Sequence, residues 1–544
     1  MRSRASRTLA SLLLATVTAS TLAETTADAF CGFFVSGADA QLYNNASQVV
    51  LMRKGNHTVM TMSNTYKGPP EDFAMVVPVP VVLQKENVKT LSADVFKHID
   101  ELSAPRLVEY WEQDPCYVPP PMKAKRMMSG APSAARMERA PSPADDMGVT
   151  IEAKFEVGEY QILILSAKES GGLEAWLKLN KYNIPKGAAA ALAPYIRDQM
   201  KFFVAKVDIK KVRRDSAGLV VLSPLRFGFD SAELRLPVRL GLLNAESKQD
   251  LIVYVLSPDS RYEVANYPNV FVPTNIEVAD AVRKSFGGFY AELFDAAMAK
   301  ANGRAVITEY AWQTTSCDPC PTPPLSQSDL YMLGDEQVFP ELATMQMAAP
   351  AGGDAPPSPP PPTSQKIGPQ PAPSTPAVMS MPPPPTRMRR PFFGRGPSWV
   401  LTRLHTRYDQ QTLNDDLLFR TAPAVWGGRA NWDGTLGDHG AQVQAGGSNN
   451  FQGRYIIRHY WEGKVTCDNP VYGRWGGRPG AGWDQSAMAP SSGNGRPEAA
   501  KDLASAPRGK VKLSDVVQSP VPELGLRGVT RKPRPGETPR STPQ

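Results

Sequence analysis

The chain has 544 residues and a formal net charge of +7, and it contains 53 Pro and 42 Gly. The charge is unevenly placed, because residues 501–544 hold nine Lys or Arg against four Asp or Glu and so supply +5. The remainder is nearly neutral, which argues against a protein whose folded core binds nucleic acid.

The first 29 residues have the features of a secretory signal peptide. Three arginines precede an apolar stretch from Leu9 to about Leu22, and Ala27-Asp28-Ala29 supplies the small side chains that a signal peptidase requires. The apolar stretch is short and is interrupted by Ser and Thr, so we expect no transmembrane segment after cleavage. The mature chain should start at Phe30 and fold in the periplasm, on the outer surface or outside the cell.

Proline-rich segments divide the rest of the chain. Between residues 350 and 391, for example, 16 of 42 residues are Pro, and such a segment cannot bury enough apolar surface to fold. The predicted organisation is a signal peptide (1–29), one folded domain in three parts (30–118, 149–320 and 397–486), two disordered insertions (119–148 and 321–396) and a disordered basic tail (487–544). The tail could instead hold an anionic envelope polymer or a membrane surface.

The first folded part predicts a hairpin, an edge segment and a helix. The β-rich run Gln48 to Met62 is interrupted by Gly55-Asn56, a dipeptide typical of two-residue hairpin turns. Phe73 to Val82 is apolar, but its two prolines lack ladder donors, so we expect it at a sheet edge or outside the sheet. A helix should follow Ser92 and end before Pro105, because four apolar residues recur on one face (Val95, Phe96, Ile99 and Leu102).

The later parts predict more strands than helices. The expected strands are Val149–Phe155, Tyr160–Leu165, Phe202–Ile209, Leu219–Leu222, Glu233–Arg239, Leu251–Leu256, Ala305–Trp312, Trp399–Tyr408 and Gly453–Trp461. The expected helices are Leu173–Leu179, Ala188–Met200, which Pro194 should interrupt, and Val278–Ala299, which Gly287-Gly288 should weaken or bend. The predicted class is α+β, a mainly antiparallel sheet with a few helices, and not a doubly wound sheet.

Several long strings resemble the bacterial secreted family known as domain of unknown function 2330. These strings are Phe30–Val35, Pro69–Pro80, Arg106–Cys116, Lys201–Asp208, Leu222–Phe227, Leu236–Asn244, Tyr262–Asn269, Thr308–Cys320 and Asn449–His459. The resemblance spans about Phe30 to Tyr472 and leaves out the insertions and the tail. It implies a single exported architecture with two variable insertions, and it brings no activity and no catalytic residues.

The cysteines are candidates for disulfides. There are five of them: Cys31, Cys116, Cys317, Cys320 and Cys467. An exported protein with five cysteines should form two disulfides and leave one thiol, but the sequence does not choose the pairing.

Cys317-Asp-Pro-Cys320 has the spacing of a thiol oxidoreductase motif. A reactive cysteine pair lowers its thiolate pKa at a helix N-terminus, whereas here three prolines follow within four residues and oppose a helix. We therefore expect a structural or labile local disulfide, with redox catalysis as the alternative. A single pair of this kind supplies only two zinc ligands, so we expect no metal site.

Motifs for other chemistry are missing from the sequence. The five histidines form no HExxH or HxH pair, and no nucleophile elbow, P-loop or dinucleotide fingerprint occurs. We name no catalytic residue and no cofactor. A copper-handling protein is a further alternative, because 11 of the 19 Met lie in the two insertions and thioethers suit Cu(I).

Four tryptophans are candidates for an interaction surface. Trp426-Gly-Gly-Arg recurs as Trp475-Gly-Gly-Arg, with Trp432 and Trp483 nearby. Exposed Trp beside Arg could stack on sugar rings or contact a partner, and a small aromatic core would give the same pattern. The sequence thus favours a non-catalytic binding or structural module stabilised by disulfides, with an envelope polymer or another envelope protein as its partner.

Overall fold

The computed structural model describes residues 33–35, 46–64, 74–116, 149–339, 398–476, 498–499 and 508–529, apart from positions 181, 183, 185, 209, 215–219, 245–247, 259, 318–319, 429, 432–438 and 441–442. The predicted signal peptide, the predicted insertion over 119–148 and Cys31 lie outside these residues. Among the described residues, no helix combines the length and the apolar character needed to cross a membrane.

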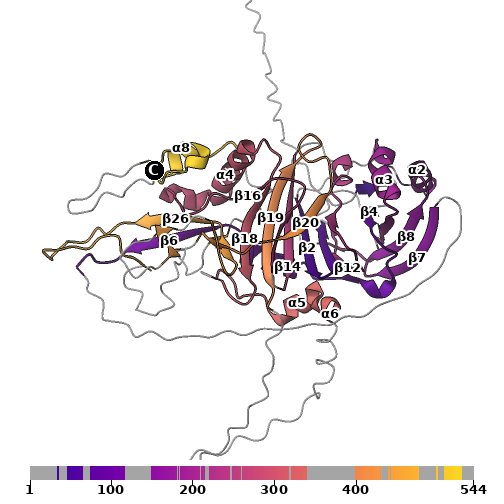
Figure 1. Cartoon of the computed structure of the whole chain (residues 1–544), viewed down its shortest axis with the longest axis horizontal. Helices are drawn as coiled ribbons and strands as arrows, with labels where there is room; N and C mark the ends of the chain where they lie inside the picture. Colours follow the sequence, from indigo (N-terminus) through magenta and orange to yellow (C-terminus); the bar gives the residue numbers. More distant parts are fainter. Residues whose placement is uncertain are drawn as a thin grey trace, which may run out of the picture.

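A large mixed sheet, here called the central sheet, forms the middle of the molecule (Figure 1). Its strands, in spatial order, are β24 (Gln444–Ala445), β21 (Val425–Gly427), β25 (Asn450–Gln452), β18 (Val306–Gln313), β19 (Val400–Tyr408), β14 (Gln249–Ser257), β2 (Ala46–Lys54), β3 (His57–Asn64), β12 (Leu225–Asp230) and β5 (Val88–Thr90), with β16 (Asn269–Phe271) also paired to β18. Most neighbours are antiparallel; β14 with β2, β16 with β18 and β21 with β25 are parallel.

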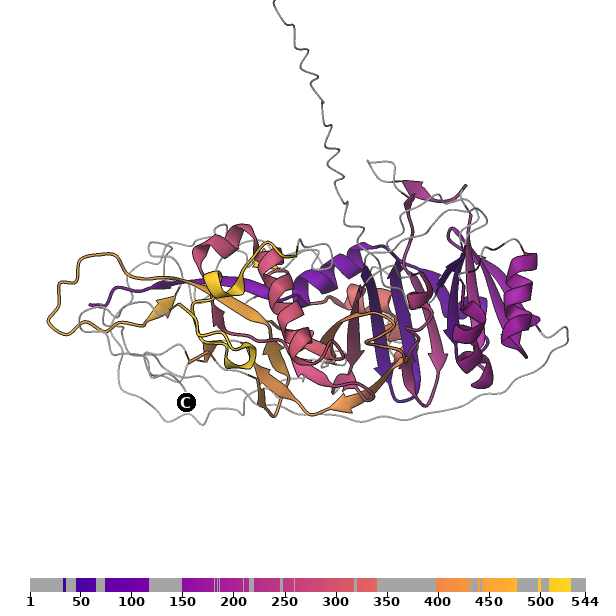
Figure 2. The same cartoon turned by 90° about the horizontal axis from the view of Figure 1, so that it is seen from above.

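A second sheet of five antiparallel strands, the side sheet, lies at one end of the molecule (Figures 1 and 2). Its order is β1 (Phe33–Val35), β4 (Ala74–Val79), β9 (Lys201–Val207), β8 (Tyr160–Ala167) and β7 (Val149–Val157). One face joins the core of the central sheet, and α2 (Ser170–Leu179) and α3 (Ala188–Arg197) cover the other.

A third sheet, the end sheet, lies at the opposite end (Figure 1). Its order is β17 (Ile276–Glu277), β26 (Arg454–His459), β6 (Arg106–Glu112) and β27 (Trp475–Gly476), and β28 (Glu498–Ala499) also pairs with β6. Smaller sheets join β13 (Leu234–Leu236), β20 (Leu417–Ala422) and β15 (Arg261–Val264), β10 (Arg213–Arg214) and β11 (Val220–Val221), and β22 (Ala430–Asn431) and β23 (His439–Gly440).

Two groups of helices cover the same face of the central sheet. One group is α1 (Asp94–Ser103), α5 (Gln327–Leu333) and α6 (Asp335–Val338), and the other is α4 (Phe286–Lys300) with α8 (Leu513–Val516). Short 3₁₀ turns lie at η1 (Lys85–Asn87), η2 (Gly241–Asn244), η3 (Asp280–Lys284) and η6 (Pro522–Leu524). The mainly antiparallel α+β class is confirmed.

Elements with a strong local pattern form as predicted. The hairpin β2–β3 turns at Gly55, whose φ of +57° lies in the left-handed region that glycine tolerates. Helix α1 buries all four predicted apolar residues of its face. The strands predicted on either side of the Pro-rich insertion, β18 and β19, pair directly with each other.

Three predicted elements differ in the structure. Strand β4 was expected at a sheet edge but lies inside the side sheet, between β1 and β9. Strand β1 pairs only with Ala74 to Val76, so Pro78 has a neighbouring strand only on the β9 side, and its missing N–H interrupts no pairing with β1. Helix α3 runs through Pro194 without interruption. The predicted helix Val278–Ala299 is divided at Ser285 into η3 and α4.

Two segments predicted to be disordered are folded in part. Residues 327–338 of the second predicted insertion form α5 and α6. A capping box at Ser326 begins α5, and the two helices bury Leu330, Leu333 and Val338. Residues 508–529 of the predicted tail pack on α4. Most of both ranges otherwise lies outside the described residues, and their predicted disorder stays a prediction.

Candidate functional site

A set of charged and hydroxyl side chains, buried at its centre and partly exposed at its edges, lies where α1 and α4 meet the same face of the central sheet. We call it the buried charge network; its members are Asp100 of α1, Asp250 and Tyr254 of β14, Tyr290 and Asp295 of α4, Glu309 of β18, and Arg403, His405 and Arg407 of β19. The network joins five elements, so its geometry depends on the whole packing of this face.

Glu309 is the centre of the network, and a strand irregularity places it there. The register between β18 and β19 shifts between Thr308 and Tyr310, which leaves Glu309 as the extra residue of β18. Its carboxylate, fully buried, accepts hydrogen bonds from the Tyr290 hydroxyl at 2.6 Å and from the Nε of Arg403. The third partner is Nδ1 of His405, at 2.8 Å.

His405 is held between two carboxylates. Its Nε2 lies 3.1 Å from Asp250, so each ring nitrogen faces an acceptor, and Phe294 of α4 stacks on the ring at 4.0 Å between centroids. Burial by itself would lower the pKa of His405, but the Glu309 carboxylate and the hydrogen bonds to Asp250 and Glu309 outweigh it and raise the pKa to about 9. Both ring protons are therefore held in place at neutral pH.

The same contacts fix the charge of Glu309. Burial by itself would raise the pKa of this carboxyl group, but the His405 and Arg403 cations lower it to about 2. A general acid or base needs a pKa near the working pH and contact with the reacting group. Glu309 and His405 meet neither requirement, because their pKa values are about 2 and about 9 and both residues are buried in the core. This arrangement holds elements together and is poorly suited to proton transfer.

The second group of polar side chains lies at the outer end of the end sheet. We call it the aromatic end; it comprises the half-buried residues Trp111, His459, Tyr460, Trp461 and Trp475. Trp111 and His459 are neighbours on β6 and β26, whereas Trp475 pairs with Glu112, so the two tryptophans lie on opposite faces of the sheet.

Each of these two tryptophans has a nitrogen-containing side chain stacked on its ring, His459 on Trp111 and Arg458 on Trp475. His459 stacks on Trp111 with the ring centroids 4.5 Å apart, and its Nε2 is 2.7 Å from Glu109, to which Arg283 also donates at 2.8 Å.

On the other face, the guanidinium of Arg458 lies 4.5 Å from the ring centre of Trp475, and Tyr460 contacts the same ring edge-on. Glu277 accepts from the Tyr460 hydroxyl at 2.8 Å and pairs with Arg458 at 3.2 Å. These contacts restrict the orientation of both tryptophan rings.

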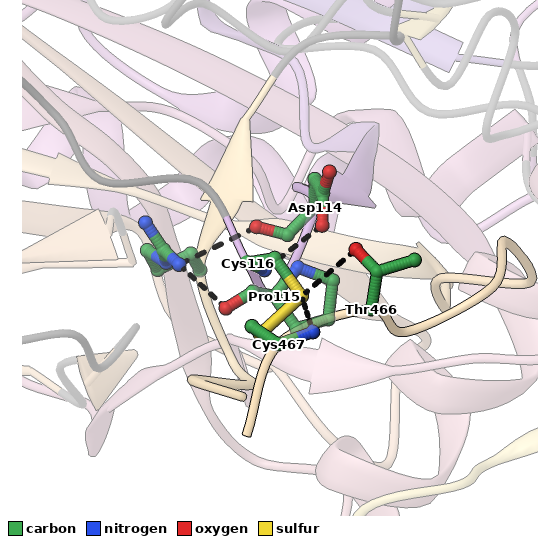
Figure 3. Close-up of a disulfide and its surroundings, with 6 residues drawn as sticks. Asp114, Pro115, Cys116, Thr466 and Cys467 are labelled. Atoms are coloured by element: carbon green, nitrogen blue, oxygen red, sulfur yellow. Dashed lines mark hydrogen bonds between the residues drawn. A yellow bond between two sulfur atoms is a disulfide. The ribbon is translucent and has the colours of Figure 1, made fainter. Parts of the chain in front are cut away.

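A disulfide closes this end of the molecule (Figure 3). Cys116 follows β6 and bonds to Cys467, which follows β26 and is 351 residues away in sequence. The backbone N–H of Cys116 donates to the side chain of Asp114 at 2.8 Å, and Arg474 donates to the carbonyl of Pro115 at 3.0 Å. The disulfide therefore ties the loop after β26, which leads towards β27, to the end of β6.

The other disulfide is local. Cys317 and Cys320 bond across three positions after β18, with their Cα atoms 5.0 Å apart. The next helix, α5, begins only at Gln327, so neither sulfur lies at a helix N-terminus that would favour a thiolate. Cys317 packs against the core and Cys320 is exposed. This geometry favours a structural or labile bond.

The four predicted tryptophans do not form one surface within the described residues. Trp426 lies on β21 of the central sheet and Trp475 on β27 of the end sheet, while Trp432 and Trp483 lie outside the described residues. Trp475 also packs on Val108 and Tyr110, as expected of a small aromatic core. In the part of the chain that the structure describes, no three His, Cys, Asp or Glu side chains are grouped to hold a metal ion.

The buried charge network escaped sequence reasoning, although β19 carries a signal for it. Arg403, His405 and Arg407 alternate with Thr and Leu residues along one strand, and three cationic side chains on the same face of a buried strand require carboxylate partners. The sequence did not show that Glu309, Asp250 and Asp100 would be those partners, since they lie 94 to 303 residues away.

Comparison with known proteins identifies one family. Neither the curated proteins nor the solved structures give a match. The family described as an uncharacterized protein conserved in bacteria (DUF2330) matches residues 25–420, which include every member of the buried charge network. The match ends before the string Asn449–His459, yet β26 from that string pairs with β6 inside the matched range. The chain belongs to this family of bacterial proteins of unknown function.

Proposed function

We propose that the mature chain is an exported binding protein that acts without turnover, and that the aromatic end is its binding surface. The observation that carries the proposal is the contrast between the two polar groups. At the centre of the buried charge network, Glu309 and His405 are buried and have pKa values of about 2 and about 9, whereas the half-exposed rings of Trp111 and Trp475 lie near the long-range disulfide. Rings whose orientation is already restricted suit binding, because they lose little side-chain entropy when a ligand binds.

The ligand we propose is an envelope polysaccharide. The apolar face of a sugar ring packs on an aromatic ring, and sugar hydroxyls exchange hydrogen bonds with charged side chains. The aromatic end offers both, with Glu109, Arg283 and His459 around Trp111 and with Arg458 and Glu277 around Trp475. Export is supported by the signal-like first 29 residues and by two disulfides, which persist in oxidising compartments.

A binding assay on insoluble polysaccharide tests this proposal. The mature chain should co-sediment with envelope polysaccharide isolated from the producing cells, and Trp111→Ala and Trp475→Ala should each weaken binding about tenfold, the worth of one lost stacking contact. Trp426→Ala is the matched control, because this half-buried tryptophan lies in the central sheet. Melting temperatures of all three variants separate lost binding from lost folding.

Two results would count against the proposal. Equal loss of binding in Trp426→Ala would mean that the aromatic end is not the surface. Sedimentation with no polysaccharide, together with capture of an envelope protein that depends on Trp111 and Trp475, would keep the surface and replace the ligand. The copper-handling alternative concerns methionines that lie mainly outside the described residues, and metal analysis of the purified native protein tests it.

A further inference from the structure

Residues 508–529 form a segment that we call the C-terminal strap. It contains α8 and η6 and lies against α4, as both views show (Figures 1 and 2). The strap is outside the range that matches the family, whereas α4, η3 and β17, on which it lies, are inside it. Between β27 and the strap, only Glu498 and Ala499 are described.

The strap binds the edge of the end sheet through its backbone. Val517 forms an antiparallel bridge with Val278, just after β17. On either side of that bridge, the N–H of Ala279 donates to the carbonyl of Val516 at 2.8 Å and the N–H of Gln518 donates to the carbonyl of Glu277 at 2.7 Å. This single bridge directly follows α8, and its backbone hydrogen bonds to a strand edge are of the kind used in peptide recognition by strand addition.

Two valines anchor the strap in the core. Val517 is 0% exposed and Val521 is 2% exposed, and both belong to the apolar cluster formed with α4 and η3. They are four residues apart and enter the same cluster. Side-chain pockets of this kind give a strand-addition site its preference for a sequence.

An arginine leads the strap and completes the charge of the buried charge network. Arg508 donates through Nε to Asp295 at 2.8 Å and lies 3.7 Å from Asp250. Without the strap, the network has four carboxylates (Asp100, Asp250, Asp295 and Glu309) and three cations (Arg403, His405 and Arg407). Arg508 of the strap is the fourth cation. Without the strap, the remaining network therefore has one more carboxylate than cations.

We propose that β17, η3 and α4, with Asp250 and Asp295 at one end, form a peptide-binding site whose ligand is the strap sequence 508–529. The strap occupies the site in cis, and the same segment of a second copy can occupy it in trans. The ligand is defined by an arginine that meets the two aspartates and by two valines, nine and thirteen residues later, that enter the apolar cluster. In the intact chain the tethered strap has a high effective concentration and outcompetes the free peptide.

Exchange of the strap tests the proposal on the folded full chain. A specific protease site is inserted after Ala504 and cleaved after folding, and a fluorescent peptide of residues 508–529 is then added. The peptide should bind the cleaved protein saturably and release the original strap, while the uncleaved protein binds at least tenfold more weakly. A peptide with Arg508→Ala should bind about tenfold more weakly, whereas Lys510→Ala, which changes an exposed cation two residues away, should bind like the parent peptide.

Hydrogen exchange in the uncleaved chain gives a second measurement. With Arg508→Ala in the full chain, the amides of Gln518 and Ala279 should exchange at least tenfold faster, while the amides of β14 and β19 keep their protection. Faster exchange in the strap and in these core strands together, or unfolding of the cleaved chain when the strap leaves, would make the strap an integral part of the core and overturn the proposal. Equal binding of the Arg508→Ala and parent peptides would also overturn it.

Discussion

At the scale of single residues, His405 and Glu309 form a buried ion pair with a nitrogen-to-oxygen distance of 2.8 Å. Burial strengthens this interaction, because the side chains of His405 and Glu309 are only 2% and 0% exposed and water screens the pair very little. Removing either charge would leave the other buried without compensation, which is the costly way to break such a pair.

The pair predicts how stability varies with pH. The pKa of His405 rises from 6.5 to about 9 on folding, so its contribution is complete below pH 6.5 and is lost as pH rises through 9. The pKa of Glu309 falls from 4.5 to about 2, so its contribution is complete above pH 4.5 and is lost as pH falls through 2. The combined contribution is therefore greatest between about pH 4.5 and 6.5.

Urea unfolding at several pH values checks this prediction. Wild type should lose roughly 3 kcal/mol of unfolding free energy between pH 6.5 and pH 10 through His405. His405→Gln should be less stable at neutral pH and should have a flatter dependence in this range. The control His57→Gln changes a histidine on β3 outside the network and should keep the wild-type slope. A wild-type slope in His405→Gln would show that other groups carry the pH dependence.

At the scale of elements, the two disulfides should differ in their contributions to stability. Cys116–Cys467 constrains a loop of several hundred residues, whereas Cys317–Cys320 closes a loop of a few residues. The entropy removed from the unfolded chain grows with loop length. We expect Cys116→Ser with Cys467→Ser to cost roughly 2–5 kcal/mol, and Cys317→Ser with Cys320→Ser to cost less, about 2 kcal/mol at most.

Thermal unfolding and a disulfide-reduction assay on the same variants check this. The expected result is a larger fall in melting temperature for the Cys116 and Cys467 pair and no reductase activity in wild type. Reductase activity in wild type that vanishes in a well-folded Cys317→Ser or Cys320→Ser variant would instead establish the thiol redox alternative.

At the scale of the whole molecule, the chain crosses between sheets many times, so parts distant in sequence hold one another. Strands β6 and β26 are neighbours in the end sheet although their hydrogen-bonded side chains are more than 340 residues apart. Strands β18 and β19 are likewise neighbours in the central sheet on either side of the second predicted insertion.

Limited proteolysis should therefore cut the chain without taking it apart. The sequence places cleavable residues in the predicted insertions, at Lys123 to Arg139 and at Arg387 to Arg390. After cleavage, the fragments should stay together under native conditions, because the pairing of β18 with β19 and of β6 with β26 crosses the cut sites. Size-exclusion chromatography and denaturing gels check this, and prompt dissociation after a cut at Arg387 to Arg390 would contradict it.

The sequence by itself determined the features that depend on neighbouring residues. The turn at Gly55, the apolar face of α1 and the apolar, β-branched runs of the strands follow from local backbone preference and composition, and they predicted the α+β class. The long strings shared with the family also identified it without a structure.

Only the tertiary structure decided which of these elements meet. It placed β4 between two strands in spite of Pro78, paired Cys116 with Cys467, and brought Glu309 to His405 through a one-residue shift of β18. It also placed Val517 of the predicted tail in the core beside α4. The physical reason is that a local pattern states what a segment can bury or pair with, whereas the partner is set by the packing of the whole chain, and here these partners are mostly about a hundred or more residues apart.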